Sequence, residues 1–242
     1  MRNFFFVPPL PPSSEPDSRE TARLCTVLIT VATSVVAALF FANNPWSDGR
    51  TAALLCAVNG ATFALHILRY RDAAMARLLL FGLCLGIVEL VADALCVRFT
   101  GTLDYSVSHS PMLWESPWWM PLAWMLVGSQ IGYLGARLIE RVGLWRGAIL
   151  SAVIGAVNIP FYEEMARYAH WWEYQFCRML PGTHTPVYIV VAELLIGLSL
   201  GPLARVALRN PSWRGAVQAG LIAGIMTILG GLIGFGLTEG IE

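Results

Sequence analysis

The chain has 242 residues, of which 56% are hydrophobic and 13% are charged, and its mean hydropathy is +0.60. Soluble domains average about 45–50% apolar and about 25% charged residues, so a soluble protein of this length would be unable to bury so much apolar sequence. The formal net charge of zero argues against a nucleic-acid partner. All 16 cationic residues are Arg, so the chain lacks the lysine that Schiff-base chemistry requires.

The chain begins with a Pro- and Ser-rich segment, residues 1–20, which we interpret as a flexible cytoplasmic tail. Seven apolar runs of membrane-spanning length follow, at about residues 22–42, 51–68, 78–97, 118–136, 147–162, 186–204 and 215–237. Asn158 and Pro160 interrupt the fifth run, and we expect the helix to break there because proline removes a backbone donor. The sequence therefore predicts an all-α polytopic membrane protein with one seven-helix domain over residues 21–242.

The arginine residues are concentrated on one side of these runs. The N-terminal segment and the turns after the second, fourth and sixth runs contain 12 of the 16 Arg. The positive-inside rule makes that side cytoplasmic, which places the N-terminus inside and the C-terminus outside a bacterial inner membrane. Most acidic residues and Trp lie on the opposite side, where the two longest loops cover residues 98–117 and 163–185.

Two stretches of the chain, residues 117–137 and 186–205, resemble each other. Both begin with Pro, carry Ala six residues later, contain a Gly-x-x-x-Gly pair and reach Ala-Arg one helix length on. Trp-Arg-Gly-Ala follows each, at residues 145–148 and 213–216, so the matches recur at a spacing of 68–69 residues. The pattern indicates duplicated helical hairpins, helices 4–5 and 6–7, with helices 2–3 as a fainter third copy and helix 1 added. We interpret the glycine pairs as helix-packing positions.

Acidic residues inside apolar runs are the main functional signal. Glu89 and Asp93 are four residues apart, so both point to the same face of a helix. Glu193 lies about 10 Å along its helix from the interface, and Glu163 follows Pro160. Ionisable groups in a membrane are costly and mark functional sites, so we predict that these four are catalytic.

A carboxylic acid in an apolar pocket suits general acid catalysis, and aromatic faces stabilise a carbocation. This combination predicts acid-initiated cyclisation or hydration of a lipid-soluble isoprenoid. No cofactor is expected. The predicted substrate-binding residues are Tyr105, Trp124, Trp172, Glu164 and His184.

Several alternatives remain open from the sequence alone. Glu89 and Asp93 could pair with Arg98 or Arg167, and Glu163 and Glu164 could simply be solvated at a helix end. A metal site could draw on Glu89, Asp93, Glu163, His170 and His184, although no established metal motif is present and no metal is predicted. Hairpin repeats also suit a transporter, and the long loops also suit a non-catalytic subunit that binds an unknown protein partner.

One family resemblance adds to this interpretation. The residues Glu89, Thr100-Gly101, Tyr105, Pro117 and Pro121-Leu122-Ala123-Trp124 occur in an order that resembles the bacterial carotenoid 1,2-hydratases. Those proteins belong to a wider set of small membrane proteins that includes membrane lycopene cyclases. The fungal integral-membrane meroterpenoid cyclases are also seven-helix proteins of about this length. The resemblance covers roughly residues 80–205 and implies an isoprenoid substrate and carboxylates that act as acids.

Overall fold

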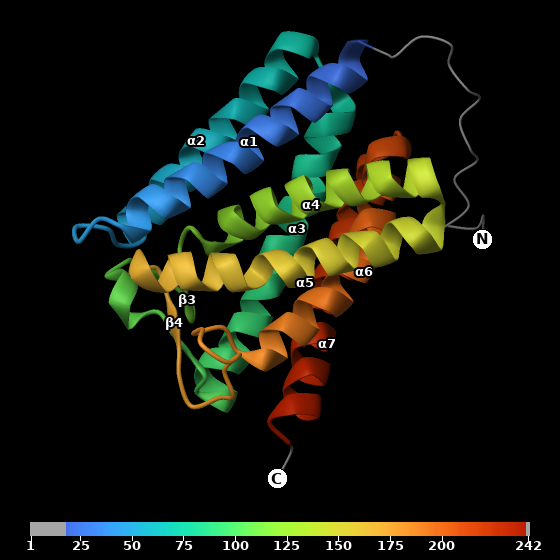
Figure 1. The fold of residues 1–242 in the computed structure, drawn as a ribbon. Helices are drawn as coiled ribbons and strands as arrows, with labels where there is room; N and C mark the ends of the chain where they lie inside the picture. Colours follow the sequence, from blue (N-terminus) through green and yellow to red (C-terminus); the bar gives the residue numbers. More distant parts are fainter. Residues whose placement is uncertain (1–17, 241–242) are drawn as a thin grey trace.

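The structure is a computed structural model, and it describes residues 18–240. Seven helices are long and apolar enough to cross a membrane, which confirms the all-α, seven-helix prediction and defines an integral membrane protein (Figure 1). They are α1 (Ser18–Ala42), α2 (Gly49–Tyr70), α3 (Ala73–Ala94), α4 (Met120–Val142), α5 (Leu144–Tyr168), α6 (Val187–Arg209) and α7 (Trp213–Thr238). Residues 1–17 of the predicted tail lie outside the described residues, and residues 18–20 already belong to α1.

The helices alternate in direction, so the bundle has two different ends. We call the end where α1, α3, α5 and α7 begin the arginine end. We call the opposite end, with residues 43–48, 95–119 and 169–186, the loop end. There α3 continues into a π-helix, η1 (Leu95–Thr100), which ends at Gly101 in the left-handed conformation that glycine favours.

The two long segments of the loop end are tied to each other. Strand β1 (Leu103–Asp104) pairs antiparallel with β4 (Glu173–Tyr174). Strand β2 (Met112–Leu113) pairs with β3 (Ser116–Pro117), and the short 3₁₀ helix η2 (Ser106–Ser108) lies between β1 and β2. These pairings hold the loops over the ends of the helices.

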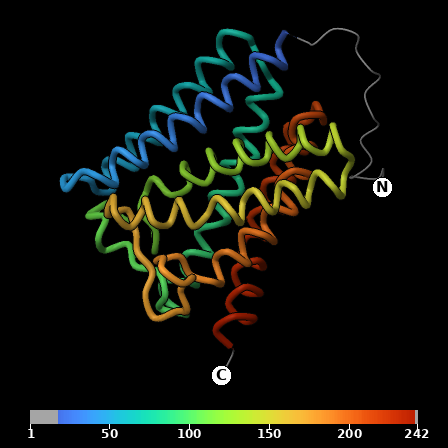
Figure 2. The backbone as a smooth tube through the Cα atoms, in the orientation of Figure 1, coloured from blue at the N-terminus to red at the C-terminus, as the bar shows by residue number. Residues whose placement is uncertain are grey.

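The predicted hairpins pack to different degrees. Helices α4 and α5, and α6 and α7, lie against each other as antiparallel pairs, and α3 packs against α4 and α7. Helix α2 instead packs mainly on α1, and these two helices run side by side (Figure 2). The fainter third copy, α2–α3, therefore does not pack as the other two hairpins do.

The packing interpretation of the glycine pairs is confirmed. A Cβ atom at Gly201 would lie 3.0 Å from the Gly135 carbonyl carbon, so α4 and α6 approach closely only without side chains there. A Cβ atom at Gly197 would lie 2.6 Å from the Ala152 Cα atom of α5. Gly128 and Gly132 face side chains of α3 and α6. The small residues therefore bring α4, α5 and α6 together.

The predicted break at Pro160 is wrong. Helix α5 continues through Pro160 to Tyr168. Proline removes only its own N–H bond, and neighbouring helices in a membrane bundle compensate for such a loss. Because the helix continues, Glu163 and Glu164 are helical residues whose side chains point in different directions.

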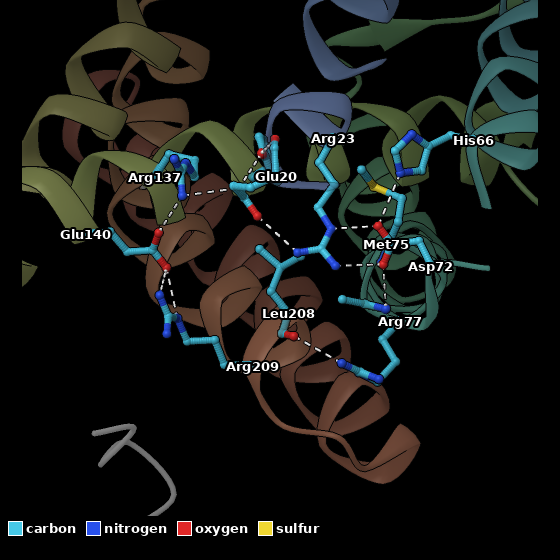
Figure 3. A network of polar contacts seen from close by, with 12 residues as sticks. Glu20, Arg23, His66, Asp72, Met75, Arg77, Arg137, Glu140, Leu208 and Arg209 are labelled. Carbon is cyan, nitrogen blue, oxygen red and sulfur yellow. Dashed lines mark hydrogen bonds and ion pairs between the residues drawn. The ribbon is translucent and has the colours of Figure 1, made fainter. Parts of the chain in front are cut away.

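Ion pairs join the helices at the arginine end (Figure 3). Arg23 of α1 donates two hydrogen bonds to the Asp72 carboxylate, at 2.6 and 2.8 Å, and His66 Nε2 lies 3.2 Å from the same group. Asp72 also caps α3 by accepting from the backbone N–H groups of Ala74 and Met75. Burial alone would raise the pKa of Asp72, but the bonds from Arg23 and His66 lower it well below its usual value.

A second group of ion pairs continues from α1 to α6. Glu20 accepts a hydrogen bond of 2.6 Å from the Tyr133 hydroxyl and lies 3.2 Å from Arg137. Glu140 lies between Arg137, at 3.0 Å, and Arg209, at 2.9 Å. Each carboxylate in this region thus has an arginine partner.

Candidate active site

A cavity of about 260 Å³ lies within the bundle, bounded by α1 and α3–α7 and covered by residues of the loop end. Its lining follows the helical period: α3 contributes Glu89, Ala92 and Asp93 from one face, and its continuation η1 contributes Cys96. Along α4 the lining runs from Met120 to Leu134, a length of about 21 Å at 1.5 Å per residue. The cavity is therefore long and narrow, and most of its wall is apolar.

The structure brings the four predicted catalytic acids to this one cavity. Glu89, Asp93, Glu163 and Glu193 all line it, and their exposed fractions are 2%, 6%, 5% and 9%. The predicted binding residues Tyr105, Trp124 and Trp172 line it as well. These side chains come from four helices and both long loops.

Asp93 is oriented by hydroxyl groups of the loop end. Its Oδ2 atom accepts hydrogen bonds of 2.7 Å from the Tyr105 hydroxyl and 2.7 Å from the Ser116 hydroxyl. Burial and the nearby Asp93 carboxyl raise the pKa of Tyr105 well above its usual value, so this phenol remains a donor at neutral pH. A carboxylate with two donors on one oxygen is an acceptor, which suits a proton-accepting role.

Glu89 contacts Asp93 from the preceding helical turn. Their side chains lie four residues apart on the same face of α3, and both line the cavity. Glu89 Oε2 has no hydrogen-bond partner in the described part of the chain, although it is fully buried. The pair therefore combines Asp93, which accepts two hydrogen bonds, with Glu89, which has an oxygen without a partner among the described residues.

Glu163 and Glu164 have different surroundings because successive helix residues are rotated by about 100°. Glu163 Oε2 accepts a hydrogen bond of 2.6 Å from Trp172 Nε1 inside the cavity. Glu164 instead binds the backbone N–H and the ring of His184, and His184 Nδ1 lies 3.1 Å from Glu164 Oε2. Glu164 and His184 do not line the cavity, so the structure does not bring these two predicted binding residues together with the others.

The internal duplication is visible in the cavity wall. Ala123 and Trp124 of α4 line it, and so do Ala192 and Glu193, which lie 69 residues later in α6. Likewise Glu163 of α5 lines it, together with Gly231, which lies 68 residues later in α7. The cavity therefore lies between the two hairpin copies, and equivalent positions carry different chemistry.

The cavity lacks basic side chains: within residues 18–240, no Arg, Lys or His lines it. Arg98 pairs with Glu115 instead of Glu89 or Asp93, and Glu163 is buried, so the pairing and solvation alternatives fail for these acids. The described residues contain no group of three His, Cys, Asp or Glu that could hold a metal ion. The five-residue metal set is accordingly not assembled.

Sequence reasoning missed several polar lining residues. Gln130 and Asn158 line the cavity, Tyr162 lies beside them, and Ser116 orients Asp93. Gln130 lies seven residues, or two helical turns, after Ala123, so the sequence could have predicted that both residues lie on the same face of this helix. Ser116 gave no such signal, because only the β2–β3 pairing delivers it to Asp93.

The fold and the site define a seven-helix integral membrane protein with a buried acidic cavity. Residues 90–238 match the model of a family described as a domain of unknown function, DUF6989. This match covers more than half of the chain, so the protein belongs to that family. Comparisons with curated proteins and with solved structures found no match.

Proposed function

We propose that this protein is a membrane enzyme that starts the cyclisation or hydration of an isoprenoid substrate with a carboxylic acid. One observation carries the proposal: four buried carboxyl groups face one apolar, aromatic cavity that no basic side chain lines among residues 18–240. An unpaired buried charge is costly in a membrane, so such groups are retained for chemistry. General acid catalysis is the chemistry that two neighbouring carboxyl groups in an apolar cavity supply directly.

The Glu89–Asp93 pair can complete a catalytic cycle. Glu89 transfers its proton to a carbon–carbon double bond, which forms a C–H bond and leaves a carbocation on the neighbouring carbon. In cyclisation a second double bond attacks that carbon, and the Asp93 carboxylate accepts the proton lost from an adjacent carbon. In hydration a water molecule adds and gives its proton to Asp93. Proton transfer between the two neighbouring carboxyl groups then returns the proton to Glu89.

The remaining wall suits a carbocation and a lipid-soluble molecule. Tyr105, Trp124 and Trp172 present aromatic rings to the cavity, and such rings stabilise a cation through their π faces. Glu163 and Glu193 would supply a second acid or hold the water for hydration. Ile154 lines the cavity and is 52% exposed on the helix surface, which supports substrate access directly from the lipid.

The arginine end supports an enzyme over a transporter. We infer that this end faces the cytoplasm, by the positive-inside rule. Alternating access would have to open it, which would break the Arg23–Asp72 bonds and the bonds from Arg77 to the α6 carbonyls of Ala207 and Leu208. The isoprenoid assignment rests on the aromatic lining and on the family resemblance of the Glu89–Trp124 segment.

The test is product formation by the purified protein in lipid nanodiscs. A panel of acyclic prenyl alcohols and polyenes is incubated with the protein, and products are detected by mass spectrometry. Cyclisation gives a product of unchanged mass, and hydration adds the mass of water. Glu89→Gln keeps the shape of the side chain but removes the acid, so the rate should fall about 10³-fold. Full product formation by both Glu89→Gln and Glu193→Gln would refute the mechanism.

A further inference from the structure

One polar group in the cavity has no role in the acid chemistry. Gln130 of α4 is 5% exposed and lines the cavity, yet its Nε2 atom has no hydrogen-bond partner among the described residues. Leaving a buried amide donor unpaired destabilises the folded protein. By contrast, Thr227, another polar lining residue, donates to the Ala223 carbonyl at 3.1 Å.

A second amide, Asn158 of α5, lies at nearly the same depth. Helices α4 and α5 are antiparallel and approach closely where Gly135 faces Ser151. Gln130 lies five residues before Gly135 in α4, and residue 156 lies five residues after Ser151 in α5, so these two positions are at the same level in the antiparallel pair. Asn158 is two residues further along α5, a distance of about 3 Å. Both side chains line the same cavity.

Glu193 also belongs to this level. A Cβ atom at Gly155 would lie 3.9 Å from Glu193 Oε2, and Gly155 is one helical turn from Asn158. The two amides and Glu193 are thus contributed by α4, α5 and α6. They form a polar zone within a wall that includes apolar residues such as Val31, Ile131 and Leu134.

We propose that Gln130 and Asn158 form a subsite that binds an oxygen atom of the substrate. Gln130 Nε2 is a donor, so the matching ligand atom is an acceptor: a carbonyl, hydroxyl or ether oxygen. This inference rests on the proposed function for placing a substrate in the cavity, and it specifies an oxygen-bearing isoprenoid instead of a pure hydrocarbon. A site built to hydrogen-bond an oxygen discriminates against analogues that lack it, since the donor is then buried unpaired.

The test is a binding assay that does not depend on turnover. Tritiated farnesol is bound to the full chain in nanodiscs, and farnesyl methyl ether and the hydrocarbon farnesene are used as competitors. In the wild-type protein both oxygen-bearing probes should bind about tenfold more tightly than farnesene, as expected for one hydrogen bond in a buried site. In Gln130→Leu this preference should disappear, while farnesene binding is kept.

The control variant is Thr227→Val, because its hydroxyl already has a partner and the oxygen preference should therefore persist. Gln130→Leu should leave the Tm unchanged or raise it, since it removes an unpaired buried donor. A wild-type protein without oxygen preference, or a Gln130→Leu protein that retains it, would overturn the subsite. If Glu89→Gln and Glu193→Gln both keep full turnover while the oxygen preference is present, the acid mechanism fails and the subsite stands.

Discussion

The arginine end and the cavity both bury acidic side chains between several helices, but their partners differ. Asp72 receives two hydrogen bonds from Arg23, and its side chain is 1% exposed. Asp93 and Glu163 are buried to a similar extent, but Asp93 accepts from hydroxyl groups and Glu163 from an indole N–H. The two regions use the same residue type in opposite electrostatic settings.

The difference separates a structural use of acids from a chemical one. A carboxylate that pairs with arginine is held in its charged form and fixes the distance between helices. A buried carboxyl group without a cation is favoured in its neutral form, in which it can donate a proton. Substitutions at the arginine end should therefore affect stability, and substitutions in the cavity should affect turnover.

The largest effect on stability should come from Asp72→Asn. The variant keeps the shape of the side chain but leaves the partly buried Arg23 without its counter-charge, so the free energy of unfolding should fall by about 3 kcal/mol. Unfolding in detergent measures this loss, and the turnover of the folded protein should be unchanged. If Asp72→Asn had the stability of the wild type, or lost turnover while it remained folded, the arginine end could not be distinguished from the cavity as a purely structural region.

The pH dependence of this effect has a defined sign. The pKa of Asp72 is lowered in the folded protein, so its contribution is complete above the unfolded pKa of about 3.9 and is lost as the pH falls below it. The Tm difference between wild type and Asp72→Asn should be constant from neutral pH to about pH 5 and should shrink near pH 3. A difference that grows on acidification would contradict the assignment.

A sharper comparison uses two adjacent residues, Glu163 and Glu164. Glu163→Gln should lower turnover about 100-fold, because this carboxyl faces the cavity and accepts from Trp172. Glu164→Gln should leave turnover unchanged, because Glu164 binds His184 away from the cavity. Product formation at equal amounts of folded protein is the measurement. Equal losses of turnover in Glu163→Gln and Glu164→Gln would mean that both substitutions act by disturbing helix α5, not by changing a group in the cavity.

The smallest effect should come from Arg98→Ala. The Arg98 side chain is 67% exposed, and exposed ion pairs contribute about 0–1 kcal/mol, so the loss of its pair with Glu115 should change stability by less than about 0.5 kcal/mol. Thermal unfolding tests this expectation. A loss of turnover in Arg98→Ala would show instead that the Arg98–Glu115 pair stabilises the loop conformation in which Tyr105 and Ser116 donate to Asp93.

Helix-level properties were predictable because they depend on local order along the chain. The seven apolar runs gave the seven helices, and the spacing of Glu89 and Asp93 gave their common face. The continuation of α5 through Pro160 was not predictable, because neighbouring helices decide whether a proline ends a membrane helix. The choice between Glu163 and Glu164 depended on the rotation of α5 in the bundle, which no local pattern specifies.

The sequence by itself determined a membrane protein of seven helices with acids in its apolar runs, because hydropathy and helical period are properties of residue order. Only the tertiary structure decided that Glu89, Asp93, Glu163 and Glu193 share one cavity and that the described arginines lie elsewhere. Only it showed that Gln130 has an unpaired donor there. The physical reason is that partners far apart in the chain, such as Asp93 and Ser116, meet through helix packing and loop pairing.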